Sequence, residues 1–220
     1  MTTLVKVWDL PTRLFHAALV FLIVAAFVTV KLGDDLMRLH AQIGLSILSL
    51  IVFRLCWGFF GGHWSQFKHF TLHPRHVIAY LKENSFNSQS YPGHNPLGSW
   101  SSILMIFALA IQALSGLCSD DEILFNGPLT PYLNAAQIEW ASFYHSEVGQ
   151  ILLITLVATH IFAIVFYKFK LKQDLITPML SGNKILVASF TPSKDNRKTR
   201  WFALVIFLLI VSVLFHFLPI

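Results

Sequence analysis

Long apolar runs alternate with short polar segments along this chain, and their lengths predict its elements. Five runs reach or approach the length of about 20 helical residues that crosses the hydrocarbon core of a membrane. They cover residues 14–32, 39–60, 101–117, 145–167 and 201–218. The brief connection around residues 33–35 makes the first two helices antiparallel neighbours. The pattern therefore predicts five transmembrane helices, and Pro74 opens a short extra helix up to Lys82 in the loop between the second and the third.

Composition and charge fit a membrane protein with little chain outside the lipid. Of 220 residues, 55% are hydrophobic and 12% are charged, whereas about 25% are charged in an ordinary soluble domain. Fourteen Lys and Arg residues lie in the loops on the side of the N-terminus, and only Lys31 and Arg38 lie on the other side. Positive residues favour the cytoplasmic side. We therefore expect a multi-pass protein with a cytoplasmic N-terminus and a periplasmic C-terminus. This bias also explains the net charge of +5, so we expect no nucleic-acid partner.

The first apolar run has a second interpretation, because Lys6 and Arg13 precede it as in a signal peptide. No small-residue cleavage site follows before the charged segment 31–35. We therefore expect a retained membrane helix.

Histidines inside the predicted membrane helices mark the candidate functional site. An ionisable side chain is costly in lipid and is a functional candidate for that reason. His16 lies near the inner end of the first helix, and His40 lies near the outer end of the second. On the fourth helix, His145 lies near the outer end and His160 lies fifteen residues further along, which is about 22 Å deeper and about 60° around the axis. The four histidines thus form two levels, with His40 and His145 outside and His16 and His160 inside.

Each level offers two imidazoles from different helices, which is what a six-coordinate haem iron needs. Such ligation leaves no open iron position, so it suits electron transfer better than oxygen chemistry. His216 near the outer end of the last helix is a competing outer ligand. The inner loop also carries histidines, but they lack cysteine partners and i, i+4 spacing, so we interpret them as solvated residues and not as a metal cluster. They are His63, His69, His73 and His76.

Haem propionates need cationic or hydrogen-bonding partners near each membrane face. Arg13 and Arg54 are the candidates at the inner level, and Arg38 is the candidate at the outer level. The alternative is that these arginines only extend their charged ends to the membrane surface.

Several short segments follow one another in a specific order. They are residues 7–16 (VWDLPTRLFH), 39–40, 54–58 (RLCWG), 93–98 (GHNPLG), 112–116, 120–121, 127–129 (GPL), His145, His160 and 182–184 (GNK). In this combination residues 5 to about 185 resemble the prokaryotic cytochrome b561 family, especially its branch similar to the b-type cytochrome subunit of nickel-iron hydrogenases.

The resemblance implies four core helices that bind two haems b in the bacterial cytoplasmic (inner) membrane. The family's ligand positions match His16, His40, His145 and His160. The resemblance also suggests a quinone or helix-capping role for His94. Residues 194–220 depart from the family pattern. We therefore expect an all-α integral membrane fold, with a four-helix transmembrane bundle binding haem in residues 1–185 and a basic segment with a fifth C-terminal transmembrane helix in residues 186–220.

Three functions are open from the sequence. The first is electron transfer through two b-type haems between the quinone pool and a partner redox protein, as a carrier or as a quinol/quinone oxidoreductase subunit. The second is a haem-containing membrane anchor of an oxidoreductase. The third is a histidine-lined metal permease, although the sequence lacks the broken helices or paired carboxylates at mid-membrane that transport usually needs.

The expected partners follow from the first function. They are membrane lipid, quinone or quinol, and an extracytoplasmic redox protein such as a c-type cytochrome or a dehydrogenase subunit. The acidic outer loop with Asp120 and Asp121 would suit a basic partner surface. A homodimer is the alternative to a monomer.

Overall fold

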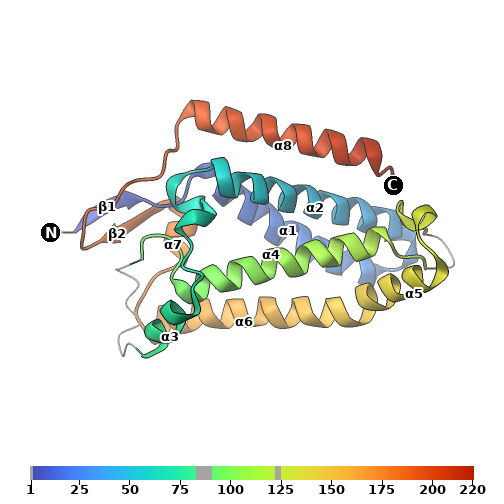
Figure 1. The fold of residues 1–220 in the computed structure, drawn as a ribbon, viewed down its shortest axis with the longest axis horizontal. Helices are drawn as coiled ribbons and strands as arrows, with labels where there is room; N and C mark the ends of the chain where they lie inside the picture. The colour runs from blue at the N-terminus through green and yellow to red at the C-terminus, as the bar shows by residue number, and fades with distance from the viewer. Residues whose placement is uncertain (1, 83–90, 122–124) are drawn as a thin grey trace. The chain divides into compact units, whose positions relative to one another are not determined.

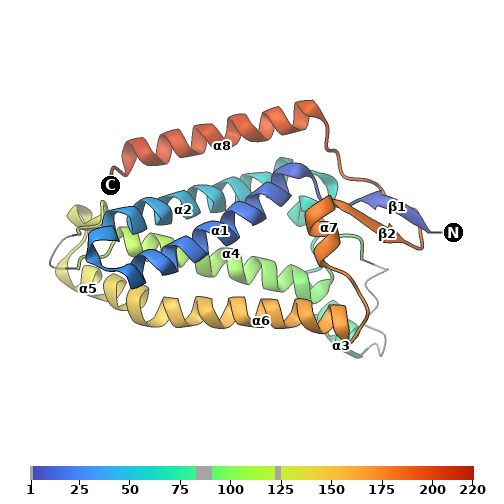
Figure 2. The same cartoon turned by 180° about the vertical axis from the view of Figure 1, so that it is seen from behind.

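A computed structural model describes residues 2–82, 91–121 and 125–220 of the chain. The structure is 73% helical, and among the described residues five helical spans are long and apolar enough to cross a membrane. The all-α, five-span prediction is therefore confirmed. The spans are α1 (Leu10–Leu32), α2 (Met37–Phe60), α4 (Pro96–Leu117), the continuous run of α5 (Ala135–Phe143), η6 (Tyr144–Gly149) and α6 (Gln150–Phe169), and α8 (Arg197–Phe217) (Figures 1 and 2).

Three helices begin four or five residues before the predicted position, because each has a polar cap that an apolarity criterion overlooks. The Asp9 carboxylate accepts a hydrogen bond from the backbone N–H of Thr12 at 2.8 Å. In the same way the side-chain oxygen of Asn95 caps α4, and that of Asn196 caps α8. Such caps satisfy backbone donors at a helix start. The predicted starts at residues 14, 101 and 201 are therefore wrong.

The predicted start of the fourth helix at residue 145 is also wrong, because α5 begins at Ala135 and continues into η6 and α6. Asn134 and Gln137 form a capping box, in which each side chain bonds the backbone N–H of the other. The sequence carried this signal as an Asn followed three residues later by a Gln.

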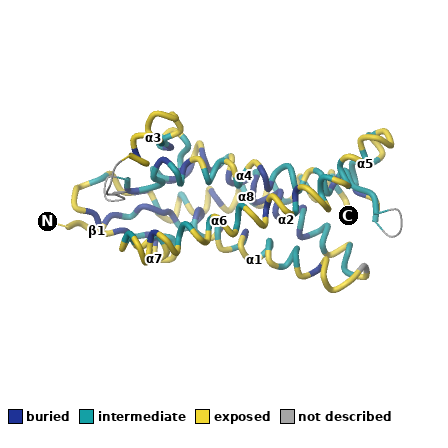
Figure 3. The backbone as a smooth tube through the Cα atoms, turned by 90° about the horizontal axis from the view of Figure 1, so that it is seen from below, coloured by how far each residue is buried: buried dark blue, intermediate teal, exposed yellow. Residues whose placement is uncertain are grey.

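The chain divides into two compact units. Unit 1 contains Met1–Leu14, Arg54–Leu104 and Val157–Ala203, and unit 2 contains Phe15–Phe53, Met105–Leu156 and Leu204–Ile220. Each long helix therefore contributes one end to each unit. Exposed positions recur along α1, α6 and α8 (Figure 3), as expected for apolar helices that face lipid.

Unit 1 contains a small antiparallel sheet that the sequence pattern did not predict. β1 (Thr3–Lys6) pairs with β2 (Asn183–Leu186), with Thr3 opposite Leu186 (Figure 1). The buried Val5, Val7, Trp8 and Leu186 form its core. The predicted boundary between residues 185 and 186 falls inside β2, and the division into domains stays a prediction. The short helix predicted from Pro74 is confirmed as α3 (Pro74–Lys82).

A fully buried carboxylate lies at the centre of unit 1. One oxygen of Asp9 accepts hydrogen bonds from the indole N–H of Trp57 at 3.1 Å and from the backbone N–H of Thr12 at the start of α1. The other accepts from the Gly62 backbone at 2.9 Å and from the Ser65 hydroxyl at 2.7 Å. Both oxygens are thereby occupied, and the start of α1 is tied to the end of α2.

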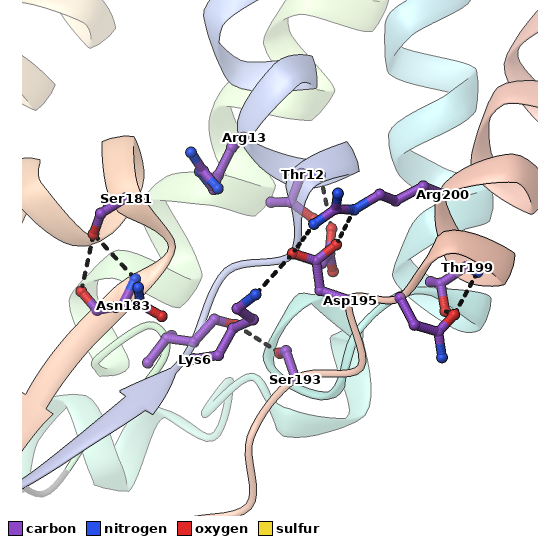
Figure 4. A network of polar contacts seen from close by, with 12 residues as sticks. Lys6, Thr12, Arg13, Ser181, Asn183, Ser193, Asp195, Thr199 and Arg200 are labelled. Atoms are coloured by element: carbon purple, nitrogen blue, oxygen red, sulfur yellow. Dashed lines mark hydrogen bonds and ion pairs between the residues drawn. The ribbon is translucent and has the colours of Figure 1, made fainter.

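A second carboxylate in unit 1 anchors the start of α8 to β1. Asp195, whose side chain is 1% exposed, pairs with Lys6 at 3.3 Å and with Arg200 at 2.7 Å (Figure 4). The hydroxyl of Ser193 donates to the carbonyl of Val7 at 2.6 Å. The segment before α8 is therefore held by specific polar contacts within unit 1.

Unit 2 has an apolar core to which α2, α4 and α8 contribute. Leu45, Leu48 and Leu117 are buried together. Leu214, Leu218 and Ile220, at the end of the chain, pack against them. The sequence beyond α6 is thus part of the core of unit 2 as well as of unit 1.

Candidate functional site

Unit 2 brings His40 and His145 together. Their ring centroids lie 6.0 Å apart and their planes make an angle of 79°. His40 lies in the first turn of α2, and His145 lies in η6. Both side chains are half-buried.

The ring of His40 is oriented by the backbone of α1. Its Nδ1 lies 3.1 Å from the carbonyl oxygen of Ala26 and 3.3 Å from the Thr29 hydroxyl. The Thr29 hydroxyl itself donates to the carbonyls of Ala25 and Ala26. The last turns of α1 therefore fix the direction of the His40 ring.

The ring of His145 is oriented in a parallel way by α4. Its Nδ1 lies 2.9 Å from the carbonyl oxygen of Gln112 and 3.3 Å from the Ser115 hydroxyl. In return, the Gln112 side-chain amide donates to the carbonyl oxygen of His145 at 2.8 Å. His145 lies in a π-helical turn, where a backbone carbonyl loses its usual helical partner. Gln112 supplies the missing donor.

Two glycines allow this close approach of α4 to η6. A Cβ at Gly116 would lie 2.7 Å from Cε1 of His145, and a Cβ at Gly149 would lie 1.9 Å from Oε1 of Gln112. Any larger residue at either position would displace the His145 ring or the Gln112 side chain.

The hydrogen bonds fix which nitrogen of each ring can bind a metal. A backbone carbonyl only accepts, so Nδ1 of His40 and of His145 must carry the proton. Nε2 then holds a free lone pair in each ring, and within the described part of the chain neither Nε2 makes a hydrogen bond. Metal-binding histidines usually donate their other N–H to such a carbonyl.

A cavity of about 390 Å³ lies beside the two rings within unit 2. This volume is in the range of about 300–1,000 Å³ found for ligand sites. Towards the middle of the helices its wall is apolar, with residues such as Ile47, Leu109 and Leu153. At the helix ends its wall is polar, and it includes Lys31 and the residues that follow α4.

The geometry suits one metal ion held between the two rings. Two imidazoles that bind opposite sides of an ion at about 2 Å each hold their centroids roughly 6 Å apart, and the observed separation is 6.0 Å. Space for a flat ring system exists next to the histidines, since a Cβ added at Gly44, one turn after His40, would meet no atom within 4 Å. The Oε1 atom of Gln112 is buried on the cavity wall without a hydrogen-bond partner among the described residues. The residues present therefore fit an iron porphyrin.

The two histidines of the predicted inner level fall in different units. His16 lies on α1 in unit 2, and His160 lies on α6 in unit 1, each half-buried. Their pairing stays a prediction.

The predicted arginines have definite partners in the structure. Arg13 donates to the carbonyl oxygen of Leu180. Arg54 is 4% exposed, donates to the carbonyl oxygen of Ser65 at 3.1 Å and lies 4.8 Å above the ring of Phe67.

Arg38 and His216 lie away from the cavity wall. Arg38 donates to the carbonyl oxygen of Ile220 at 3.3 Å and is not among the residues that line the cavity. His216 is exposed, and its ring packs against Phe217. The structure thus brings His145, and not His216, next to His40.

The remaining histidines lie in unit 1. His94 lies between the rings of Trp8 and Phe70, each 4.8 Å away, and its Nε2 is 3.0 Å from the Ser102 hydroxyl. The cap of α4 comes from the neighbouring Asn95. The inner-loop histidines form pairs, with 3.9 Å between the rings of His63 and His69, and no group of three metal-binding side chains occurs in the described residues.

Sequence reasoning missed the groups that orient the histidines. Gln112, Ser115 and Gly116 lie in one of the segments that carry the family resemblance, but no pattern in the sequence links them to His145. Thr29, near the end of α1, left no signal beyond polarity in an apolar run.

A comparison with known proteins adds a family. The family model described as prokaryotic cytochrome b561 matches residues 7–182, which is most of the chain and ends before β2 and α8. No curated protein and no solved structure matches the chain.

Proposed function

Because the chain belongs to the prokaryotic cytochrome b561 family, we propose that its b-type haem chemistry uses two haems, one bound by His40 and His145 and one by His16 and His160. Family membership and the five apolar spans make the chain a multi-pass membrane cytochrome that transfers electrons. The number of haems, their ligands and the redox partners belong to the proposal.

The arrangement of His40 and His145 is the observation that carries the proposal. Their Nδ1 atoms are held by backbone carbonyls, their centroids are 6.0 Å apart, and a cavity lies beside them. A bound haem supplies an iron that takes up and releases a single electron. His40 and His145 would hold the iron through their two imidazoles, and a haem held in this way would serve electron transfer and not oxygen chemistry.

The inner haem is proposed from depth along the helices and from unit 1 cations. Arg54 is a buried cation whose Nη1 has no hydrogen-bond partner among the described residues. The buried Asp9 carboxylate already acts on the charge of Arg54, and a haem propionate would be an acceptor for the Nη1 that lacks one. Arg13 is the second candidate for this role, and Arg38 stays a prediction for the outer haem.

The proposed electron path runs between the quinone pool and an extracytoplasmic redox protein, such as a c-type cytochrome or a dehydrogenase subunit. The excess of Lys and Arg in the loops of the N-terminal side supports a cytoplasmic N-terminus. A relation to the hydrogenase-associated branch and a homodimer are further parts of this proposal.

Optical spectra and haem counts of single-histidine variants test the proposal. The purified protein should show a reduced-minus-oxidised b-type α-band and two haems per chain. His145→Ala should remove the outer haem, and His160→Ala should remove the inner one, leaving one haem in each case. His216→Ala is the matched control and should keep both.

Other results would favour the other functions. Lack of any b-type band would leave the histidine-lined permease as the better hypothesis. Haems that neither a quinol analogue nor a partner protein can reduce would favour the anchor subunit.

A further inference from the structure

The cavity beside His40 and His145 changes character along the helices. On α2, Met37 lies three residues before His40 and Ile47 lies seven residues after it, which is about 4.5 Å in one direction and about 10 Å in the other. The deep end is mainly apolar, with Ile47, Leu109 and Leu153 on its wall. The outer end is made by the last turn of α1, the start of α2, the segment after α4 and Ser142.

Two carboxylates belong to the outer end. Asp121 accepts a hydrogen bond from the backbone of Phe125 at 2.8 Å, and the backbone N–H of Asp120 donates to the Ser142 hydroxyl at 3.1 Å. These bonds hold the acidic segment against the mouth of the cavity. Any further anion placed here meets negative charge and requires a cation close by.

Lys31 is that cation. Among the residues that line the cavity in the described part of the chain it is the one Lys or Arg. It lies in the last turn of α1, where a positive charge is favourable, five residues after Ala26, whose carbonyl holds His40. Arg38, the other cation of this side, is engaged by the Ile220 carbonyl.

We propose that the haem bound by His40 and His145 lies with its propionate edge at the outer end of the cavity, where Lys31 pairs with a propionate. The inference rests on the proposed function and deepens it. A porphyrin has an apolar edge and a charged edge, and only this orientation places the apolar edge against Ile47, Leu109 and Leu153. Lys31 is then a positioning residue that also sets the haem potential, because a nearby positive charge favours the reduced iron.

Potentiometric titration of the solubilised full-length protein tests this orientation. Lys31→Gln should lower the midpoint potential of one of the two haems and leave the other unchanged, while Lys31→Arg should restore it. Haem transfer to an excess of apomyoglobin should become roughly fivefold faster for that haem in Lys31→Gln, as expected for the loss of one partly exposed ion pair. Arg38 is the alternative propionate partner, and Arg38→Gln should alter neither measurement if Lys31 holds the propionate. Lys172→Gln, which removes an exposed cation of unit 1, is the matched control and should also alter neither.

Two outcomes would overturn the inference. One is a shift in Arg38→Gln without a shift in Lys31→Gln, which would make Arg38 the propionate partner. The other is an unchanged potential and transfer rate in both Lys31→Gln and Arg38→Gln, which would show that the propionate edge does not lie at the outer end. A wild-type protein without haem at the outer site would instead contradict the proposed function, so the two failures are distinguishable.

Discussion

Units 1 and 2 contain ends of the same five helices, but they use their interior polar groups differently. In unit 1, both oxygens of Asp9 are occupied by donors from its own chain. In unit 2, the Nε2 atoms of His40 and His145 and Oε1 of Gln112 have no hydrogen-bond partner within the described residues, and a cavity adjoins all three side chains. Satisfied polar groups hold a structure together, whereas oriented groups without partners beside a cavity mark a ligand site.

Arg54 departs from this pattern within unit 1, and it is not alone there. One buried nitrogen each of Arg13, Arg54 and His69 has no hydrogen-bond partner among the described residues. The two arginines are the predicted inner propionate partners, which is why the inner haem is proposed beside them.

Among the changes that separate the two units, removal of the Asp9 carboxylate should have the largest effect on stability. Asp9→Ala would leave the indole of Trp57, the backbone of Gly62 and the Ser65 hydroxyl without their acceptor. We expect a loss of about 3–5 kcal/mol in the free energy of unfolding, measured by thermal unfolding in detergent micelles. Asp174→Ala, which removes an exposed helix cap in the same unit, should cost only about 1 kcal/mol. Equal losses in the two variants would refute the central role of Asp9.

A methyl group in the cavity of unit 2 should act on the haem and not on the fold. Gly44→Ala adds a Cβ that meets no protein atom within 4 Å, and alanine favours a helix over glycine by about 1 kcal/mol. Stability of the protein without haem should therefore be kept or increased. The outer haem should be lost, so that haem per chain falls from two towards one in a pyridine haemochrome assay.

Ser46→Ala is the control for that substitution, because Ser46 lies on the same helix and does not line this cavity. Retention of both haems in Gly44→Ala would show that the cavity is not where the porphyrin lies.

Loss of the Gln112 amide should disturb the outer site without emptying it. Gln112→Leu leaves the carbonyl oxygen of His145 without its donor, which should cost about 1–3 kcal/mol in unfolding free energy. The His145 ring keeps its bond to the Gln112 backbone, so the haem should remain, with an altered low-spin EPR signal from a changed ring orientation. Gln150 lines the same cavity and makes no bond to His145. An identical EPR change in Gln150→Leu would therefore argue against a specific role for Gln112.

The parts that sequence reasoning reached are those set by long-range pattern. Apolar length predicted the five spans, and depth along the helices predicted that His40 and His145 lie at one level, as the structure places them. Short polar contacts were out of reach. The pairing of β1 with β2 joins two four-residue strands more than 170 residues apart, and four residues are too few for a periodic signal.

The π-helical turn at His145 illustrates the same limit. Its register is decided by Gly149 and Gln112, which come together only when α4 packs against η6. The choice between Lys31 and Arg38 as the outer cation likewise depends on the position of Ile220, which the hydropathy pattern does not give.

The ion pairs at the start of α8 should give the smallest effect, visible as a pH dependence. The hydrogen bond from Arg200, with that from Lys6, holds the pKa of Asp195 below its ordinary value. Because the pKa is lower in the folded state, the pairs stabilise the fold above the unfolded carboxyl pKa of about 3.9, and this contribution is lost as the pH falls through the folded pKa. Asp195→Asn should therefore lower stability by about 1 kcal/mol at pH 7 and by progressively less below pH ~4. Thermal unfolding at pH 7 and at pH ~3 measures the difference, with the exposed Glu139→Gln as the matched control. A deficit in Asp195→Asn that stays constant across this range would mean that Asp195 acts through packing and not through its charge.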